Sequence, residues 1–203
     1  MKNKIKIAVL VSGGGTNLQA LIDAEKAEII KSGKLSLVIS NNKNAYALIR
    51  AKEADIDTAV VTKADCGGSQ VEFEKRIVTL LEENGIGLIV LAGFMSILSE
   101  DFTKRYPNRI INIHPSLIPA FCGKGFYGLR VHEAALERGV KVTGATVHYV
   151  NEIPDGGEII MQKCVSIRKD ETPESLQKRV MKLAEWKILP KAAEEVCKKL
   201  LGE

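Results

Sequence analysis

Short runs of apolar residues alternate with longer, helix-periodic segments along the first two-thirds of the chain. An unbroken apolar run is typical of a strand buried on both faces, as in a parallel sheet covered by helices. Apolar residues spaced three and four apart predict amphipathic helices between these runs, and Gly33 is expected to close the first of them. The predicted strands are KIKIAVLVS, LSLVIS, DTAVVT, GLIVLAG and RIINIHP, and the predicted helices occupy 17–33, 45–54 and 69–85.

The pattern changes after about residue 140. Two segments, 140–150 and 156–167, alternate more strictly between apolar and polar residues. Only NEIPDGG separates them, which is too short for a helical crossover, so we expect an antiparallel pair at one side of the sheet. A terminal helix follows, with Thr172 as its N-cap and Pro173 at its first position. Pro190 is expected to kink or interrupt this helix.

These elements predict an α/β fold, a single doubly wound, Rossmann-like domain over residues 1–203. Its central sheet is expected to be mostly parallel, with antiparallel strands late in the chain. No repeat, low-complexity segment or linker divides the sequence. In such sheets ligands bind beyond the carboxyl ends of the strands, where the winding reverses. The residues that end or follow the first and fifth predicted strands are therefore candidates for a site.

Composition and charge exclude several classes of protein. Hydrophobic residues make up 45% of the 203 residues and charged residues 27%, which is ordinary for a globular domain. The 29 basic and 25 acidic residues form no basic stripe, so we expect no nucleic-acid partner. The N-terminal apolar run ends at Ser12, too early for a signal peptide, and no run has the length of a membrane span. Four cysteines without a CxxC pair are typical of reduced thiols, so we expect a cytoplasmic protein. We also expect that it does not bind membranes.

A glycine-rich loop, VSGGGTNLQ, joins the first strand to the first helix. Glycines let a backbone turn tightly and approach a ligand, and the free N–H groups of a helix N-terminus attract an anion. The loop is not a dinucleotide fingerprint, because Leu18 stands where the third glycine would be, and no Walker A lysine follows. A monophosphate cradle, to which Thr16 and Asn17 add a hydroxyl and an amide, is favoured over a plain tight turn.

Asn112 and His114 lie two residues apart at the end of the fifth strand, so their side chains point to the same side. An amide can donate a hydrogen bond to an oxygen that gains negative charge, and an imidazolium can donate another or deliver a proton. A carboxylate that favours the protonated ring would complete such a set. Asp155, in NEIPDGG, can fill this role, although the two glycines that follow it also suit a simple turn.

The other histidines carry less information. His148 can line the same cavity or belong to the core, and His132 is expected at the surface or at a helix cap. Three histidines without HExxH or HxH spacing predict no metal site, and no G-x-S-x-G elbow marks a serine nucleophile. We therefore expect chemistry without a metal.

Several motifs together resemble those of the glycinamide ribonucleotide formyltransferases, which transfer a formyl group from 10-formyltetrahydrofolate in purine biosynthesis. NIHPSLIP marks the wider group of formyl-folate enzymes, and SGGGTNLQ together with NIHPS points to the ribonucleotide enzymes. The resemblance implies an N-terminal part that binds the ribonucleotide phosphate and a C-terminal part that binds folate and carries the catalytic loop. The similarity covers essentially the whole chain, through VLVSGGGTNLQALI, LAGFMSILS, IINIHPSLIPAF, GVKVTGATVHYV, DGGEII and RVMKLAEWKILP.

The resemblance also implies roles for individual residues. Asn112, His114 and Asp155 would form the catalytic triad. Lys182 would face the 5′-phosphate and Glu185 the ribose hydroxyls, so that the ribonucleotide contacts Gly15, Thr16, Asn17, Lys182 and Glu185. The folate would contact two loops and the strand end, through Met95, Ser96, Ile97, Leu98, Asn112, Asn151, Glu152, Ile153, Pro154 and Asp155.

In the implied reaction the neutral amine of the substrate attacks the formyl carbon, without a covalent enzyme intermediate. Asn112 and protonated His114 would stabilise the oxyanion, and Asp155 would raise the imidazole pKa and assist passage of the proton to the folate nitrogen. The partners would be small molecules, glycinamide ribonucleotide and the co-substrate 10-formyltetrahydrofolate. The protein would be a monomer or a homodimer, and no metal is implied.

The sequence departs from the family pattern at a few positions. Gln70 and Ser96 stand where arginine is frequent, Trp186 stands where histidine is common, and the FCGKGFYGL loop is longer than in many members. One alternative is a 10-formyltetrahydrofolate deformylase, with the same triad and water as acceptor, although that family normally carries a further N-terminal regulatory domain. Another is a non-catalytic nucleotide-binding module, which would give the triad no role. A methionyl-tRNA formyltransferase would need an added tRNA-binding region, and a dehydrogenase would need the third glycine.

Overall fold

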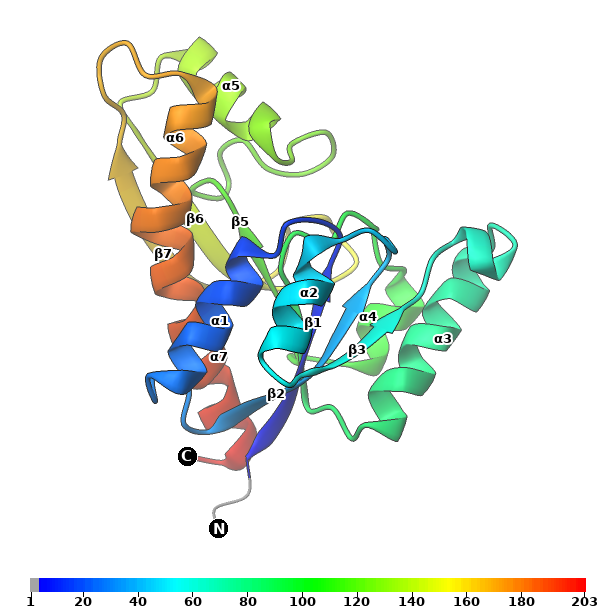
Figure 1. Ribbon diagram of the computed structural model, residues 1–203. Helices are drawn as coiled ribbons and strands as arrows, with labels where there is room; N and C mark the ends of the chain where they lie inside the picture. Colours follow the sequence, from blue (N-terminus) through cyan, green and yellow to red (C-terminus); the bar gives the residue numbers. More distant parts are fainter. Residues whose placement is uncertain (1–3) are drawn as a thin grey trace.

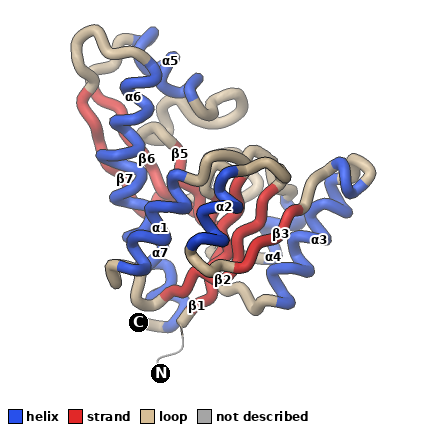
Figure 2. The backbone as a smooth tube through the Cα atoms, in the orientation of Figure 1, coloured by secondary structure: helices blue, strands red, loops and turns tan. Residues whose placement is uncertain are grey.

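The computed structural model describes residues 4–203. Its strands form one sheet and are β1 (Ile5–Val11), β2 (Gly33–Ser40), β3 (Asp57–Val60), β4 (Leu88–Leu91), β5 (Ile110–His114), β6 (Val142–Tyr149) and β7 (Ile159–Ser166). They are ordered β3-β2-β1-β4-β5-β6-β7 (Figures 1 and 2). The pairs from β3 to β5 are parallel, whereas β6 pairs antiparallel with both β5 and β7. The predicted fold class is confirmed, including the late antiparallel strands.

Helices cover both faces of the sheet (Figure 1). They are α1 (Thr16–Lys26), α2 (Tyr46–Glu53), the 3-10 helix η1 (Ala64–Cys66), α3 (Gln70–Glu83), α4 (Glu100–Arg105), α5 (Leu129–Arg138), α6 (Pro173–Val180), the π-helix η2 (Met181–Glu185) and α7 (Trp186–Leu201). Apolar side chains of α1, α2, α6 and α7 pack into the larger core on one face. Those of α3 and α4 pack into a second core on the other face.

The central strand β1 shows why both faces need cover. Ile7, Val9 and Val11 are fully buried in the larger core, whereas Ala8 and Leu10 are fully buried in the second one. Successive residues of a strand point to opposite faces, so a strand between two layers of helices is apolar at every position. The unbroken apolar run in the sequence has this origin.

The winding of the chain reverses between β1 and β4. From β1 the chain passes outward to β2 and β3, and it then returns to β4 and continues to β5 on the other side. The loops that follow β1 and β4 meet at this point, because the N–H of Met95 donates to Oγ of Ser12 at 2.8 Å. Doubly wound sheets bind ligands in this crevice, and the loop 12–15 lies in it.

Some expectations about helices are wrong. Helix α1 ends at Lys26, and Gly33 opens β2 instead of closing the helix. A Cβ at Gly33 would lie 2.5 Å from Cδ1 of Ile7, so the glycine serves close strand packing. Pro190 lies inside α7 without ending it, and the irregularity falls earlier, in the π-helix η2. Helices α4 and α5 occupy segments for which no helix is predicted.

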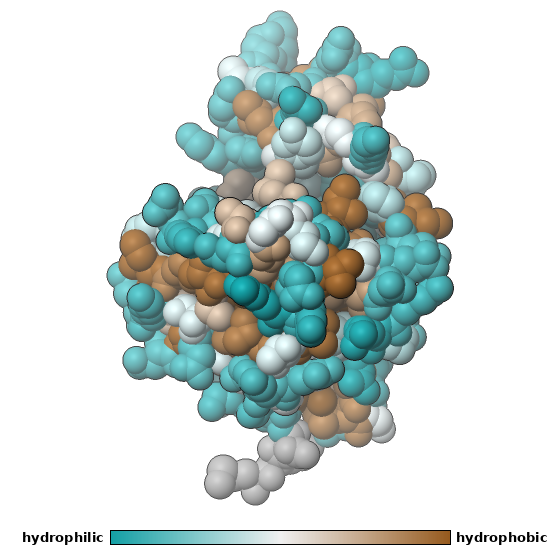
Figure 3. Space-filling view, turned by 90° about the vertical axis from the view of Figure 1, so that its right-hand side faces the viewer, coloured by the Kyte–Doolittle hydropathy of each residue, from teal (hydrophilic) through white to brown (hydrophobic). Residues whose placement is uncertain are grey.

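The surface that carries α3 and β3 is mainly hydrophilic, with small separate hydrophobic groups (Figure 3). Val60 on β3 and Val71 on α3 are among the exposed large hydrophobic residues. Within residues 4–203, none of the helices combines the length and the apolar character needed to cross a membrane. The cysteines are free thiols, as expected, at Cys66, Cys122, Cys164 and Cys197.

Candidate active site

The loop after β1 adopts the tight turn that its glycines predict. Gly15 has a φ of 70°, and a Cβ there would lie 2.6 Å from Cβ of Ala47, so only glycine fits. The loop is held against α2 by two hydrogen bonds. The N–H of Ala47 donates to the carbonyl of Gly13 at 3.1 Å, and Nε of Arg50 donates to the carbonyl of Gly14 at 2.9 Å.

Helix α1 begins directly at this loop and has no side-chain cap. Its first N–H groups therefore have no acceptor from an N-cap side chain, and they lie at the positive end of the helix dipole. A helix N-terminus of this kind attracts phosphate. The geometry supports an anion site at the predicted residues Gly15, Thr16 and Asn17.

Asn17 joins the glycine loop to the C-terminal helices. Its Nδ2 donates to Oε2 of Glu185 at 2.7 Å, and its Oδ1 is buried without a hydrogen-bond partner among residues 4–203. Burial raises the pKa of Glu185 to about 7, against the opposing effect of the hydrogen bond from Asn17. Glu185 thus lies beside the loop, next to the expected phosphate position.

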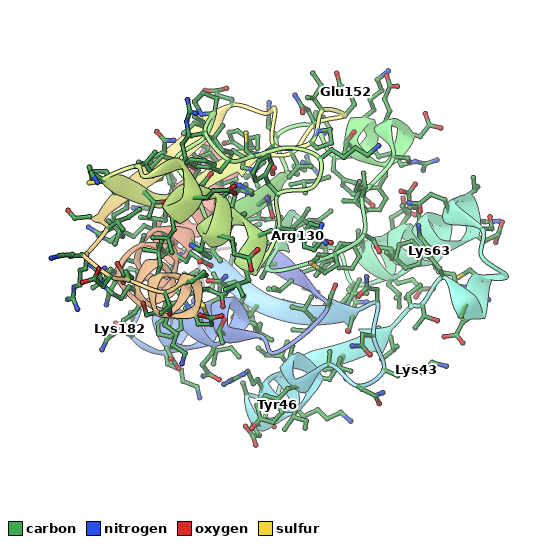
Figure 4. All side chains as sticks on the ribbon, turned by 90° about the horizontal axis from the view of Figure 1, so that it is seen from above. Lys43, Tyr46, Lys63, Arg130, Glu152 and Lys182 are labelled. Carbon is green, nitrogen blue, oxygen red and sulfur yellow. The ribbon has the colours of Figure 1, made fainter. Side chains whose placement is uncertain are left out.

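Lys182 lies in different surroundings from Glu185, although both belong to η2. Glu185 is buried, whereas Lys182 is exposed and lies at the outer edge of the molecule (Figure 4). A π-helix has a wider turn than an α-helix, so residues three positions apart do not share a face as they would in an α-helix. That Lys182 and Glu185 contact one ribonucleotide stays a prediction.

The antiparallel pairing of β5 with β6 builds the rest of the site. Asn112 stands opposite His148 in the register, and Nδ2 of Asn112 lies 3.1 Å from Nε2 of His148. Nδ1 of His148 lies 2.8 Å from the carbonyl oxygen of Tyr149, to which it can only donate. In the neutral ring Nε2 is then free to accept a hydrogen bond from the amide of Asn112. His148 therefore fixes the orientation of the Asn112 side chain.

Asp155 lies between two imidazoles. Its Oδ2 is 3.5 Å from Nδ1 of His114, and its Oδ1 is 3.5 Å from Nε2 of His148. The N–H of Gly123 also donates to Oδ2, at 2.8 Å. Burial acts to raise the pKa of Asp155, but the neighbouring imidazoles of His148 and His114 and the Gly123 N–H together hold it below its ordinary value. Asp155 is therefore a carboxylate at neutral pH.

His114 is almost completely buried, with 4% of its surface exposed. Its Nε2 lies 2.9 Å from the carbonyl oxygen of Phe121, to which it can donate. Burial lowers the pKa of His114, and His148 lowers it further, whereas Asp155 and the Phe121 carbonyl act to raise it. Asp155 acts on the imidazole pKa in the expected direction, but burial has the larger effect and the net shift is downward.

The FCGKGFYGL loop covers this cluster through backbone atoms, the carbonyl of Phe121 and the N–H of Gly123. Phe121 has a φ of 51° and Asp155 a φ of 56°. A positive φ is tolerated by aspartate but costs a bulky residue about 1–3 kcal/mol. The strained point of the loop is therefore the one that contacts His114.

Of the two loops expected to bind folate, the one after β4 leaves the sheet at the end where β5 carries His114. The loop after β6 leaves beside the start of β5, because β6 is antiparallel, and Asp155 brings it to His114. Met95, Ile97 and Ile153 are more than half exposed and offer apolar surface. Leu98 is buried in the second core, so only its backbone can face a ligand. Glu152 lies at the periphery in Figure 4.

Two of the unusual residues hold one of these loops in place. Oγ of Ser96 accepts a hydrogen bond from Nδ2 of Asn41 at 2.9 Å. Nε2 of Gln70 donates to the carbonyl of Ile97 at 3.1 Å. Both residues therefore stabilise the segment that carries Met95 and Ile97. In the same way, Oδ1 of Asn151 accepts from the N–H of Ile153 at 3.0 Å and shapes the opposite loop.

The remaining histidine does not match its prediction. His132 is fully buried on α5 rather than exposed or capping, and burial lowers its pKa to about 4. Among residues 4–203, no group of three or more His, Cys, Asp or Glu side chains is arranged so that it could hold a metal ion. The backbone contacts of Phe121 and Gly123 also went unpredicted, and no residue type in the loop signals them.

Comparisons with known proteins agree with this architecture. A family model described as formyl transferase matches residues 5–193. The chain is 42% identical to the phosphoribosylglycinamide formyltransferase of Haemophilus influenzae, over 91% of this chain and 84% of that protein. It is 45% identical to the human trifunctional purine biosynthetic protein adenosine-3 over 96% of its own length, but it spans only 18% of that longer protein.

Solved structures show the same similarity. Glycinamide ribonucleotide transformylase 1 of Symbiobacterium toebii superposes with a TM-score of 0.90 at 38% identity, covering 98% of this chain and 90% of that one. The phosphoribosylglycinamide formyltransferase of Coxiella burnetii, solved in complex with CHES, has a TM-score of 0.85 at 40% identity, covering 98% and 89%. Since both the family model and these relatives match nearly the whole length, the chain belongs to the formyl transferase family, among the phosphoribosylglycinamide formyltransferases.

Proposed function

We propose that this protein transfers the formyl group of 10-formyltetrahydrofolate to the amine of N1-(5-phosphoribosyl)glycinamide. The products are formylglycinamide ribonucleotide and tetrahydrofolate. The observation that carries the proposal is the cluster of Asn112, His114 and Asp155 at the same sheet edge as an uncapped glycine loop. A phosphorylated acceptor and a formyl donor need these two features together.

The N-terminal part binds the ribonucleotide in this proposal. The backbone N–H groups of Gly15, Thr16 and Asn17 hold the 5′-phosphate at the start of α1. Glu185, which already accepts a hydrogen bond from Asn17, accepts others from the ribose hydroxyls. Lys182 is exposed, and its ammonium group faces the 5′-phosphate in this proposal.

The C-terminal part and the loop after β4 bind the folate. Apolar side chains of Met95, Ile97 and Ile153 are exposed and can cover the rings of the co-substrate. Leu98 turns its side chain into the core, so only its backbone groups can contact the folate. The remaining folate contacts that we propose are Ser96, Asn112, Asn151, Glu152, Pro154 and Asp155.

Transfer begins when the neutral amine attacks the formyl carbon, so that a C–N bond forms and the formyl oxygen becomes an oxyanion. Asn112 donates one hydrogen bond to this oxygen. Nε2–H of His114 donates a second once the oxygen takes the place of the Phe121 carbonyl, which now accepts that bond. Each such donor contributes about 3–4 kcal/mol to stabilisation of the transition state.

The tetrahedral intermediate then collapses. The bond between the formyl carbon and N10 of the folate breaks, and the proton lost by the amine passes to N10. Asp155, whose carboxylate lies beside Nδ1 of His114, assists this transfer by accepting the amine proton and passing it to N10. No covalent enzyme intermediate and no metal take part in the proposed route.

The test is to measure formation of tetrahydrofolate spectrophotometrically, with and without glycinamide ribonucleotide. Turnover that requires the ribonucleotide, together with a formylated product detected by mass spectrometry, supports the transferase. Turnover without it, with release of formate, would instead identify a deformylase. Binding of the ribonucleotide without any turnover would indicate a non-catalytic module.

A further inference from the structure

A groove runs along the pair α1 and α7, and Thr16 of the expected phosphate site is among the residues that line it. Its volume is about 480 Å³, which lies in the range of small-molecule sites. The two helices pack side by side (Figure 1), and Arg50 reaches the groove from α2. None of Asn112, His114 and Asp155 lines it.

The floor of the groove is apolar. Ala20 and Ala24 line it from α1, and Trp186 and Pro190 line it from α7. The short alanine side chains leave space opposite the indole and the proline ring. A flat, apolar body can therefore pack between the two helices, and an aromatic ring gains most from the contact with Trp186.

The rim of the groove is positively charged. Arg50, Lys187 and Lys191 lie on it, together with one acid, Asp23. Asp23 already accepts a hydrogen bond from Nε2 of Gln19 at 2.9 Å. Neither lysine forms an ion pair within the described part of the chain. The rim therefore offers cationic groups that an anionic group on a ligand can neutralise.

Arg50 is already held in a fixed position. Its Nε donates to the carbonyl of Gly14 at 2.9 Å, and its Nη1 donates to Oε1 of Gln19 at 2.9 Å. The guanidinium also lies 5.0 Å from the ring centre of Tyr46, which is labelled in Figure 4. Nη2 has no acceptor among residues 4–203. Binding through Nη2 would thus need little further ordering of this side chain.

We propose that this groove is a second binding site, for a small molecule with an aromatic ring system and one anionic group. The ring lies between the alanines of α1 and Trp186, and the anion faces Arg50, Lys187 and Lys191. The proposal uses none of Asn112, His114 and Asp155, and the groove adjoins the expected phosphate site at Thr16.

The chain provides its own reporter for this site. Trp186 is the one tryptophan in the sequence, so its indole N–H gives a single resonance in a 1H–15N spectrum of the labelled protein. The probe is naphthalene-1-sulfonate, and 1-naphthylmethanol is its neutral control. We expect the indole resonance to shift saturably with the sulfonate, with one site per chain, and to shift much less with the alcohol.

Charge reversal localises the binding. The double variant Lys187→Glu, Lys191→Glu should weaken sulfonate binding about tenfold, which corresponds to about 1.4 kcal/mol. The control variant Lys75→Glu, Lys141→Glu carries the same charge change on exposed residues of α3 and of the loop before β6, and it should bind like the wild type. Equal weakening in both variants, or no shift of the indole resonance, would overturn the proposal. A shift that depends on protein concentration without probe would also overturn it, in favour of a second copy of the chain in the groove.

Discussion

Nδ2 of Asn112 lies 3.1 Å from Nε2 of His148, its partner across the antiparallel pair β5 and β6. The amide is thereby oriented by a residue that is itself 1% exposed and held by a backbone carbonyl. His148 thus orients the amide, and Asn112 donates the hydrogen bond to the substrate oxygen in the proposed reaction. This division of roles leads to different expectations for their variants.

Asn112→Ala should lower kcat by about 10²–10³-fold, because it removes a donor to the oxyanion. His148→Ala should lower kcat by only about 10-fold to 100-fold, because the donor remains and loses its support. KM for the ribonucleotide should change little in either variant. Steady-state kinetics with both substrates test this order, and an equal loss in the two variants would show that His148 takes part directly.

Asp155→Asn should lower kcat by about 10²–10⁴-fold, the range for loss of positioned acid–base chemistry. It should also lower the pKa of His114 further, because the carboxylate is one of the groups that act to raise it. NMR titration of His114 measures this second effect separately from turnover. A His114 pKa that rises in the variant would contradict the electrostatic role of Asp155.

Glu185 should make the protein less stable as the pH rises. Its pKa is about 7 in the folded protein and 4.5 as its ordinary value, so the unfolded chain releases this proton first. Stability is therefore fully present below about pH 4.5 and falls as the pH rises towards 7, by on the order of 2–3 kcal/mol. Glu185→Gln should remove this fall, because the neutral amide can still accept the hydrogen bond from Asn17.

Urea unfolding at pH 5 and pH 8 measures this difference. The matched control is Glu133→Gln, at an exposed position of α5, which should keep the pH dependence of the wild type. If Glu185→Gln loses as much stability between the two pH values as the wild type does, the buried carboxyl is not its source.

Gly15→Ala should destabilise the fold by about 1–3 kcal/mol, because it combines a positive φ with a contact of 2.6 Å to Cβ of Ala47. Gly13→Ala is the control within the same loop, since a Cβ there meets nothing within 4 Å. Thermal unfolding of the two variants should therefore differ clearly. Similar midpoints would mean that α2 does not pack against the loop as described.

Much of this architecture follows from local patterns. The strands, the crevice at their carboxyl ends and the juxtaposition of Asn112 with His114 depend on periodicity and on strand geometry, which a sequence displays. The partner of Asn112 is different, because His148 is selected by the register between two strands far apart in the chain. The pKa of His114 is also set by three-dimensional burial, which no neighbour in the sequence reports.

Glycine and proline gave misleading signals for a related reason. Gly33 suits a helix end by residue type, but the constraint at that position is the close approach of Ile7 from another strand. Pro190 suits a helix break, yet it lies in the second turn of α7, directly after the irregular segment. His132 was mispredicted for a similar reason. Its polar residue type suggests exposure, but it lies on the face of α5 that packs inward.

Helices α6 and α7 are continuous through the π-helix η2, which sets how far α7 is rotated about the helix axis relative to α6. Each residue of an α-helix rotates the chain by about 100°, so the number of residues in the wide turn fixes which side of α7 meets the sheet. Removing one residue from this segment would turn the apolar stripe of α7, with Ile188, Leu189 and Val196, away from its core. The number of residues in η2, five, is therefore as important for the packing of α7 as their identity.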